Sequence, residues 1–301
     1  MRRVTAQGVE IPTIGLGTSR LCGEVARRMV GYALEIGYRH IDTAQGYGNE
    51  SQVGEAIGAS SVPRDDIWLT TKINLSRLRD SSLQRAAEES VRKLGTEPNL
   101  LLLHWPNAKI PLRETMGALN EIQRTGLTEH IGVSNFTAAL MQQAISLSEA
   151  PLIVNQVEYH PYLCQPTVLK ALRANGIVLT AYSPLARGRV FRDSKLRRIG
   201  ERHGKTAGQV ALRWLVQQDG VIAIPRSSQE ANASFNLEIF DFELTGAEMN
   251  EISSLGTPWG RISDPLRQAP AWDDLSAVDQ VRRKSGQVVR AVARRLRRRF
   301  R

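Results

Sequence analysis

The chain of 301 residues contains only two cysteines, Cys22 and Cys164. Two cysteines are too few for the disulfide framework of a small secreted domain, so we expect a reducing, cytoplasmic setting. The N-terminus carries arginines but no apolar stretch behind them, which argues against a secretory signal peptide. No uninterrupted apolar run approaches the roughly 18 residues of a membrane-spanning helix. Because 42% of the residues are hydrophobic, the chain can still build a sizeable core.

The excess of positive charge is confined to the C-terminal end of the chain. The formal net charge is +10, from 40 Lys and Arg against 30 Asp and Glu. Ten of the basic residues and none of the acidic ones lie in 282–301, which leaves 30 of each sign in 1–281. The body is therefore neutral, and the high isoelectric point does not indicate a basic catalytic surface.

The same C-terminal end carries a sparse apolar pattern. Apolar residues recur every four positions among the arginines, at Val288, Val292, Leu296 and Phe300. This spacing is typical of a narrow apolar stripe on a cationic helix. We expect a barrel domain over 1–273 and a basic tail over 274–301, either disordered or an amphipathic helix. Weak contact of the tail with an anionic membrane or nucleic acid is the alternative to a solvated tail without a partner.

Eight short apolar runs alternate with eight helical patterns along the chain. The predicted strands are 13–18, 38–43, 67–72, 100–105, 130–135, 153–158, 177–182 and 221–226. The predicted helices are 24–36, 49–59, 80–94, 112–125, 137–147, 166–175, 206–218 and 229–237. This alternation favours an α/β fold in which parallel βα units close into a (β/α)8 TIM barrel. A doubly wound open sheet is the alternative, but the turn after the first strand lacks the pattern G-x-G-x-x-G.

Three segments stand outside the alternation. Residues 4–15 are typical of a β-hairpin with its turn at Gln7-Gly8, which we expect to plug the floor of the barrel. Residues 183–193 follow the seventh strand, and residues 256–273 form a terminal loop with three prolines and two tryptophans. We expect both loops to lie over the mouth of the barrel, where long ordered loops are usually functional.

Four polar residues lie in or just after the predicted strands: Asp42, Tyr47, Lys72 and His104. A barrel gathers its strand ends at one mouth, so we expect the four to meet there. A free phenol titrates near pH 10, and we expect the ammonium of Lys72 to lower the pKa of Tyr47. Asp42 would hold Lys72 by a charge-assisted hydrogen bond, and His104 would orient a substrate carbonyl. Each residue alone has an ordinary structural explanation, and their joint placement predicts a proton-transfer site.

The motifs GLGT, DTAQGYGNE, LTTKIN, LLLHWP, GVSNF, NQVEYHP, AYSPLARG and IPRSS together resemble the aldo-keto reductase family, from about Val4 to Asp273. The ending GRISDPLRQAPAWD resembles the bacterial 2,5-diketo-D-gluconate reductase and methylglyoxal reductase branch. The resemblance implies a (β/α)8 barrel that reduces aldehydes and ketones with NADPH, without a metal. It also implies Tyr47 as the proton donor, Lys72 and Asp42 as its tuning pair, and His104 as the carbonyl orienter. The five histidines show no paired spacing of metal ligands, in agreement with this.

The resemblance also implies a cofactor site. Asn135 and Gln156 match the residues that hold the nicotinamide carboxamide, with Ser134 beside them, and amide side chains suit this task because they donate and accept. Tyr182 matches the ring that stacks on the nicotinamide, and Ser183, Pro184 and Leu185 match the loop over the pyrophosphate. The full expected set is Thr18, Ser134, Asn135, Gln156, Tyr182, Ser183, Pro184, Leu185, Arg187, Pro225, Arg226, Ser227, Ser228, Asn232 and Asn236.

Two groups of positions depart from the family pattern. Arg226 stands where a lysine is usual and Asn232 where an arginine is usual, and both positions face the 2′-phosphate of NADPH. Arg226 can still form a forked bond to a phosphate, whereas Asn232 has no charge, so NADPH is expected and use of NADH stays open. The substrate pocket keeps Trp105 but has Ser19 and Asn74 at positions that are often aromatic, which suits small hydroxylated carbonyls.

These observations predict a monomeric cytoplasmic enzyme for small polar aldehydes and ketones, of the 2,5-diketo-D-gluconate or methylglyoxal type. The hydride would come from the nicotinamide and the proton from Tyr47. The alternative is a nucleotide-binding, redox-sensing or regulatory barrel with poor turnover, tethered by its basic tail.

Overall fold

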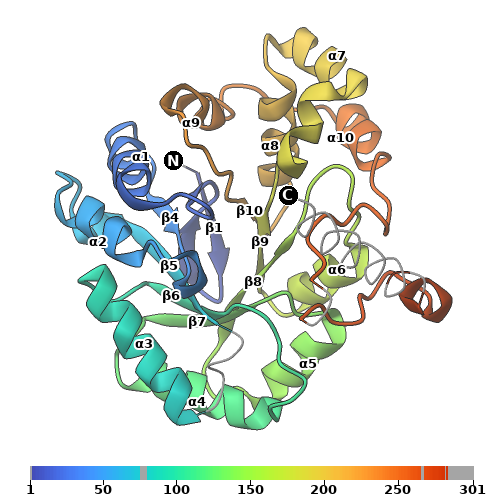
Figure 1. Cartoon of the computed structure of the whole chain (residues 1–301). Coiled ribbons are helices and arrows are strands. Elements are labelled where there is room, and N and C mark those ends of the chain that lie inside the picture. The colour runs from blue at the N-terminus through green and yellow to red at the C-terminus, as the bar shows by residue number, and fades with distance from the viewer. Residues whose placement is uncertain (1, 75–79, 266–267, 282, 284–301) are drawn as a thin grey trace, which may run out of the picture.

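The computed structural model describes residues 2–74, 80–265, 268–281 and 283. Eight parallel strands form one central sheet in which neighbours follow the chain order (Figure 1). They are β3 (Leu16–Gly17), β4 (His40–Asp42), β5 (Trp68–Ile73), β6 (Leu100–Leu103), β7 (His130–Ser134), β8 (Leu152–Glu158), β9 (Val178–Tyr182) and β10 (Val221–Ala223). The sheet curls until its two edges meet, because Ile14 forms a parallel bridge with Ala223 and the N–H of Gly15 donates to the carbonyl of Ala223 at 2.9 Å. The predicted (β/α)8 barrel is therefore confirmed, and the doubly wound sheet was not adopted.

The eight predicted helices lie on the outside of the sheet (Figure 1). They are α1 (Gly23–Glu35), α2 (Glu50–Gly58), α3 (Asp80–Leu94), α4 (Leu112–Arg124), α5 (Ala138–Leu147), α6 (Pro166–Ala174), α8 (Ala207–Val216) and α9 (Glu230–Leu237). Two further helices, α7 (Ser194–His203) and α10 (Gly246–Ser253), were not predicted. Both have side-chain caps, since Asp193 accepts hydrogen bonds from the first turn of α7 and Thr245 forms a capping box with Glu248.

The two predicted N-caps had different outcomes. Thr137 caps α5, because its hydroxyl accepts a hydrogen bond from the N–H of Leu140. Asn49 occupies the N-cap position of α2 but makes no cap bond with its side chain. That side chain instead donates to the carbonyls of Thr18 and Leu21 at 3.0 and 2.9 Å, so it ties the start of α2 to the loop after β3.

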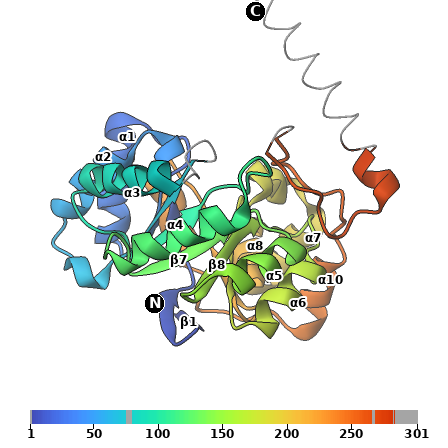
Figure 2. The same ribbon diagram turned by 90° about the horizontal axis from the view of Figure 1, so that it is seen from below.

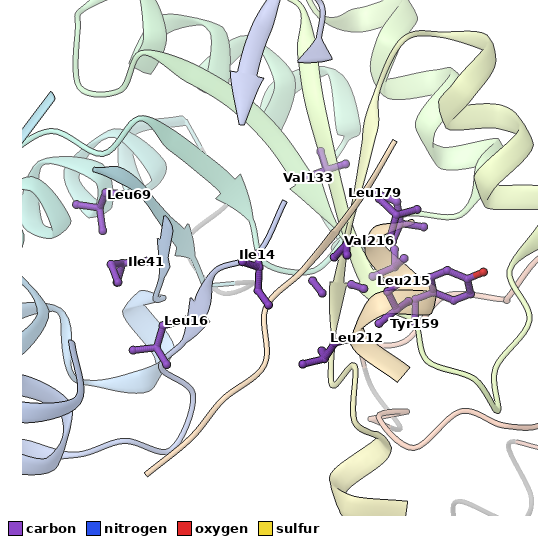
Figure 3. Close-up of a cluster of buried hydrophobic side chains, with 14 of the residues drawn as sticks. Ile14, Leu16, Ile41, Leu69, Val133, Tyr159, Leu179, Leu212, Leu215 and Val216 are labelled. Carbon is purple, nitrogen blue, oxygen red and sulfur yellow. The ribbon is translucent and has the colours of Figure 1, made fainter. Parts of the chain in front are cut away.

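Apolar side chains fill the layer between the strands and the helices. Figure 3 shows part of this cluster, with Ile14, Leu16, Ile41, Leu69, Val133, Tyr159, Leu179, Leu212, Leu215 and Val216 labelled. A smaller cluster comprises residues of β5, β6, β8, β9 and β10 together with Ala6 and Ile11 of the N-terminal hairpin. The strands thus bury both faces, which explains why they appear in the sequence as continuous apolar runs.

The N-terminal hairpin closes one end of the barrel. Strands β1 (Arg3–Ala6) and β2 (Val9–Pro12) pair antiparallel. The turn residues Gln7 and Gly8 have φ of 50° and 84°, the left-handed pair that a tight hairpin turn requires. Ala6 and Ile11 are fully buried against the barrel interior. In Figure 2 the hairpin lies at the bottom of the barrel, at the end away from the helical turn at residues 277–281, which is drawn in red.

Residues 256–265 and 268–273, which we call the C-terminal loop, run across the other end of the barrel. The backbone N–H groups of Ile262 and Ser263 each donate to the carboxylate of Glu158, at the end of β8, at 2.6 Å. Near the end of the loop, the ring of Trp272 meets that of Trp105 edge to face, with centroids 6.3 Å apart. The expected loop over the mouth is thus present.

The described part of the predicted tail packs against the barrel. Residues 277–281 and 283 are helical. The hydroxyl of Thr167 in α6 donates to Asp274, and the amide of Gln280 donates to the carbonyl of Trp272. The apolar stripe from Val288 to Phe300 lies outside the described residues, and the domain boundary after 273 stays a prediction. Within the described ranges, no helix combines the length and apolarity that crossing a bilayer requires.

Candidate active site

The structure brings the four polar residues at the strand ends together. Asp42 ends β4, Lys72 lies in β5, His104 follows β6, and Tyr47 ends the short helix η1 (Gln45–Tyr47). The Nζ of Lys72 lies 2.6 Å from Oδ1 of Asp42 and 5.1 Å from the ring centroid of Tyr47. The rings of Tyr47 and His104 meet edge to face with centroids 5.7 Å apart. The predicted juxtaposition of the four is therefore present.

Lys72 keeps its charge although none of its side chain is exposed. Burial by itself would lower the pKa of Lys72, but the nearby Asp42 carboxylate and Tyr47 outweigh it, and the pKa lies above its usual value. The ammonium also donates to the carbonyl of Thr43 at 2.7 Å. A fixed, paired cation therefore lies beside the phenol of Tyr47.

The pKa of Tyr47 is raised, whereas the sequence led us to expect a lowered one. Burial raises the pKa of this phenol most, while Lys72 and, more weakly, Ser19 lower it. The expectation was wrong because it counted the ammonium and not the removal of the phenol from water. The raised pKa keeps Tyr47 protonated at neutral pH, so the phenol carries a proton that it can donate.

His104 is a neutral imidazole at physiological pH. Burial, with a smaller contribution from the charge of Lys72, lowers the pKa of His104 to about 3. Its backbone carbonyl accepts a hydrogen bond from the side-chain amide of Asn135 at 3.0 Å. A neutral imidazole has one N–H to donate, which suits a carbonyl oxygen as the acceptor.

One cavity of about 900 Å³ opens beside these residues. Asp42, Tyr47 and His104 line it, while Lys72 lies behind its wall. Of the expected cofactor residues, those that line the cavity are Ser134, Asn135, Gln156, Tyr182, Ser183, Pro184, Leu185, Arg187, Pro225, Arg226, Ser227, Ser228, Asn232 and Asn236. Thr18 is fully buried outside this lining, and its hydroxyl donates to the carbonyl of Asp42 at 3.0 Å.

The expected substrate-pocket residues are divided. Ser19 and Trp105 line the cavity. Asn74 is not among the lining residues. It lies against Gly46, since a Cβ added to Gly46 would be 2.7 Å from Oδ1 of Asn74. Gly46 precedes Tyr47, so this close approach packs Asn74 against the turn that carries the phenol.

Amide and phenol side chains form a connected network at the end of the cavity that Asp42, Tyr47 and His104 line. Oδ1 of Asn135 accepts from the hydroxyl of Tyr182 at 2.8 Å, and its Nδ2 donates to Ser134 at 3.0 Å. Asn135 has a left-handed backbone, with φ of 64°. The Nε2 of Gln156 donates to Asp42 at 2.7 Å, while its Oε1 receives no hydrogen bond from the described residues. An acceptor therefore remains available beside an aromatic ring, which fits a carboxamide-bearing ring as a ligand.

Three arginines line the cavity in addition to the amide and phenol side chains. The arginines are Arg20, Arg187 and Arg226. Among the described residues, none of the three forms a salt bridge or side-chain hydrogen bond. Arg20 and Arg187 have left-handed backbones, with φ of 64° and 53°. Unpaired guanidinium groups in a cleft are suited to bind phosphates.

Sequence reasoning missed a set of lining residues that tertiary structure alone brings to the cavity. They are Gly17, Arg20, Gly188, Phe191, Thr206, Gly208, Gln209, Ile224, Gln229, Phe235 and Ser263. Thr206, Gly208 and Gln209 come from the start of α8, where a Cβ on Gly208 would meet the ring of Phe191 at 2.7 Å. Phe191 lies in the loop 183–193, which we expected over the mouth of the barrel. That expected position was the one sequence signal that could have placed Phe191 at the cavity.

The cavity as a whole fits a nicotinamide dinucleotide with a small second ligand. Its volume lies at the upper end of the ~300–1,000 Å³ that is typical of ligand sites. It combines neutral amides and an aromatic ring with unpaired arginines, as a molecule with a carboxamide ring and phosphates requires. Among the described residues, no group of three His, Cys, Asp or Glu is arranged to hold a metal ion.

Comparison with known proteins gives consistent matches. Residues 13–257 match the sequence profile of the Aldo/keto reductase family. The chain is 41% identical to methylglyoxal reductase DkgB of Salmonella typhi over 267 residues, 87% of this chain and 99% of that protein. It is 40% identical to an aldo-keto reductase of Mycolicibacterium smegmatis, over 81% of this chain and 87% of that protein. It superposes on the crystal structure of a candidate 2,5-diketo-D-gluconic acid reductase B with a TM-score of 0.89 and 49% identity, covering 91% of this chain and 98% of that one.

Proposed function

The chain belongs to the aldo/keto reductase family and is an oxidoreductase of carbonyl compounds, and on this premise we propose that it reduces small polar aldehydes and ketones with NADPH. The observation that carries the proposal is the shared cavity, which the proton-transfer residues and the unpaired arginines both line. The named relatives suggest methylglyoxal and 2,5-diketo-D-gluconate as substrates. We also propose a cytoplasmic location, because the chain has only two cysteines, and we keep the expected monomer as part of the proposal.

The cofactor would be held along the whole cavity. Asn135 and Gln156 would bind the carboxamide, with the face of Tyr182 against the nicotinamide ring. The bound nicotinamide would supply the hydride. The hydrogen bond from Tyr182 to Asn135 fixes the orientation of the aromatic ring before any ligand enters.

Tyr47 would provide the proton for the reduced carbonyl oxygen. Neutral His104 would donate its N–H to that oxygen and so hold it beside the phenol. As the proton leaves Tyr47, the ammonium of Lys72 would stabilise the phenolate that forms. Asp42 keeps Lys72 in place, at 2.6 Å, and water entering the cavity would return the proton to the phenolate.

Arg226 would be the main charged contact of the 2′-phosphate. Its guanidinium lines the cavity and can form two parallel bonds to a phosphate. Asn232 lines the same region, and its amide donates to Gln229 at 2.9 Å rather than offering a charge. The preference for NADPH over NADH would therefore rest on one arginine where the family commonly has two cations.

The substrate side of the cavity favours small, hydroxylated carbonyls. Ser19 and Ser263 line it with hydroxyl groups, and Trp105 supplies the apolar wall. A bulky aryl substrate would leave these hydroxyls without partners, which costs binding free energy.

Steady-state consumption of NADPH with methylglyoxal and with 2,5-diketo-D-gluconate tests the proposal. We expect carbonyl-dependent oxidation of NADPH by the wild type and its loss in Tyr47→Phe. Tight binding of NADPH without turnover on any small carbonyl would reject the reductase and favour the redox-sensing alternative.

A further inference from the structure

We propose that Arg283 is a positioning residue for the substrate side of the cavity, acting through the C-terminal loop. This inference rests on the proposed function, because it assigns a role in substrate binding to that same site. Arg283 lies 26 positions after the end of the family match at residue 257. Three successive contacts, through Asp264 and Trp272 to Trp105, lead from its guanidinium to the cavity wall.

The guanidinium of Arg283 binds the C-terminal loop at two points. Its Nη1 and Nη2 both donate to the carbonyl of Pro270 at 3.1 Å. Nη1 also lies 3.4 Å from Oδ1 of Asp264. Only 9% of Arg283 is exposed, so these charged contacts are shielded from solvent and are stronger than surface ion pairs.

Asp264 contacts both Arg283 and Trp272. The indole Nε1 of Trp272 donates to the same Oδ1 of Asp264 at 3.0 Å. Arg283 and Trp272 therefore share one carboxylate oxygen, which crosslinks the start and the end of the loop. Trp272 in turn packs edge to face on Trp105, which lines the cavity.

The opposite side of the loop is held from inside the barrel. Glu158 is fully buried and accepts the N–H groups of Ile262 and Ser263 at 2.6 Å each. Ser263 lines the cavity next to Tyr182. The loop is thus held between Glu158 within the barrel and Arg283 on its outside, and Ser263 and Asp264 are consecutive residues.

Arg261 depends on this arrangement for its position. Its guanidinium stacks 3.5 Å over the ring of Trp272. Its Nη1 is buried and has no hydrogen-bond partner among the described residues. The carboxylates of Glu158 and Asp264 also act on its charge. The stack is the contact that joins this cation to Trp272, so we expect a shift of Trp272 to disturb both Arg261 and Trp105.

The consequence of losing Arg283 is a looser substrate wall with an intact cofactor site. The contacts that lead from Arg283 to the cavity wall involve Pro270, Asp264, Trp272 and Trp105, and none of these residues is proposed to bind the carboxamide or the phosphates. Loosening the loop should thus weaken binding of the carbonyl substrate and leave the affinity for NADPH unchanged. Proton transfer by Tyr47 should also persist, since Asp42 and Lys72, which support the phenol, lie in β4 and β5 and not in the loop.

The test uses Arg283→Gln, Arg283→Lys and Asp264→Asn in the full chain. The matched control is Arg173→Gln, which also removes an arginine bonded to a backbone carbonyl, that of Asp219 at 3.1 Å, at the hairpin end of the barrel. Each variant is measured for KM and kcat with methylglyoxal and 2,5-diketo-D-gluconate, and for the Kd of NADPH. Amide hydrogen exchange at Ile262 and Ser263 reports on the loop independently of activity.

We expect Arg283→Gln to raise KM about threefold to tenfold, the effect of weakening one charge-assisted contact, with kcat and the Kd of NADPH within about twofold. Exchange at Ile262 and Ser263 should accelerate by a similar factor. Arg283→Lys should recover part of the effect, since lysine keeps the charge but not the fork. Because Arg283 and Asp264 share a contact, the double variant should be less impaired than the product of the single ones.

Unchanged KM and unchanged exchange in Arg283→Gln would overturn the role of Arg283, as would an equal effect in Arg173→Gln. A parallel loss of NADPH affinity would also overturn it, because the residue would then be a general structural support. If the wild type turns over no carbonyl, the proposed function fails. Accelerated exchange at Ile262 and Ser263 in Arg283→Gln would in that case still support the role of Arg283 in holding the C-terminal loop.

Discussion

The side-chain amide of Gln156 donates to Oδ2 of Asp42 at 2.7 Å, while the other oxygen of that carboxylate binds Lys72 at 2.6 Å. One buried carboxylate thus connects a residue proposed to bind the cofactor with the lysine proposed to assist the proton donor. Asp42 is 1% exposed and Gln156 is 2% exposed, so water cannot replace either bond. The cofactor site and the proton-transfer site are therefore coupled through Asp42.

This coupling predicts two separate losses in Gln156→Leu. The free energy of unfolding should fall by about 1–3 kcal/mol, because a buried oxygen of Asp42 loses its donor. The affinity for NADPH should fall as well, because the carboxamide loses a partner. Urea unfolding and cofactor fluorescence titration measure the two effects.

Gln165→Leu is the control for this variant. Gln165 is also a buried amide, and it donates to the carbonyl of Glu158 at 2.9 Å outside the cavity lining. This control should lose stability and keep its affinity for NADPH. Wild-type affinity in Gln156→Leu would show that Gln156 only supports Asp42.

Lys72→Met should lose turnover and stability for different reasons. The rate of reduction should fall by about 10²–10⁴, because the phenolate of Tyr47 loses its neighbouring cation. The free energy of unfolding should fall by about 3–5 kcal/mol, because Asp42 becomes an unpaired buried charge. Adding Asp42→Asn removes that charge and should restore stability without turnover, as urea unfolding and steady-state kinetics can measure. Turnover that returns with stability would assign Lys72 a structural role alone.

Most of the barrel could be predicted from the sequence because its strands are buried on both faces. Each reads as a short apolar run, and the helices between them carry a clear apolar face. Helix α7 was missed because half of its segment 194–203 is charged, with Leu196, Ile199 and Gly200 as its buried residues. The side chain of Asn49 took long-range backbone partners instead of its local cap, which no local pattern reveals.

The candidate site was predictable where it lies on strand ends and not where loops from distant parts of the chain converge. Asp42 and Lys72 follow from strand order alone. Arg20 and Ser263 reach the same cavity from segments more than 240 positions apart, and only the folded chain brings them together. The pKa of Tyr47 was mispredicted for a related reason, since desolvation depends on everything packed around the phenol.

Arg226→Ala should separate the two nicotinamide cofactors. Loss of a charge-assisted bond to the 2′-phosphate should weaken NADPH by about 1.5–3 kcal/mol and leave NADH nearly unchanged. Asn232→Arg should shift discrimination in the opposite direction, by adding a charge at a lining position. The Kd values of both cofactors, measured for each variant, check the prediction. Equal weakening of NADPH and NADH by Arg226→Ala would make Arg226 structural.

Stability should decline in mild acid because two buried histidines are neutral in the folded protein. Burial lowers the pKa of His40 to about 4 and that of His104 to about 3, from 6.5 in the unfolded chain. Below pH 6.5 the unfolded chain binds more protons than the folded chain. The contribution of the two histidines to the free energy of unfolding is therefore fully present above pH 6.5 and is lost as the pH drops toward the folded pKa values.

Each histidine should remove about 2 kcal/mol between pH 6.5 and about pH 5. Urea unfolding at these two pH values measures the loss. His104→Gln deletes one titrating group and should roughly halve the pH dependence. Parallel pH profiles for the wild type and His104→Gln would mean that His104 is not the group that resists protonation.

Tyr47 is proposed to donate the proton to a carbonyl that NADPH reduces. The direct measurement compares Tyr47→Phe with the wild type for NADPH affinity and for single-turnover reduction of methylglyoxal. We expect an unchanged Kd for NADPH and a reduction rate lower by about 10²–10⁴, because the variant keeps the ring and loses the donor. A rate within about threefold of the wild type, at equal NADPH occupancy, would contradict the assignment of Tyr47.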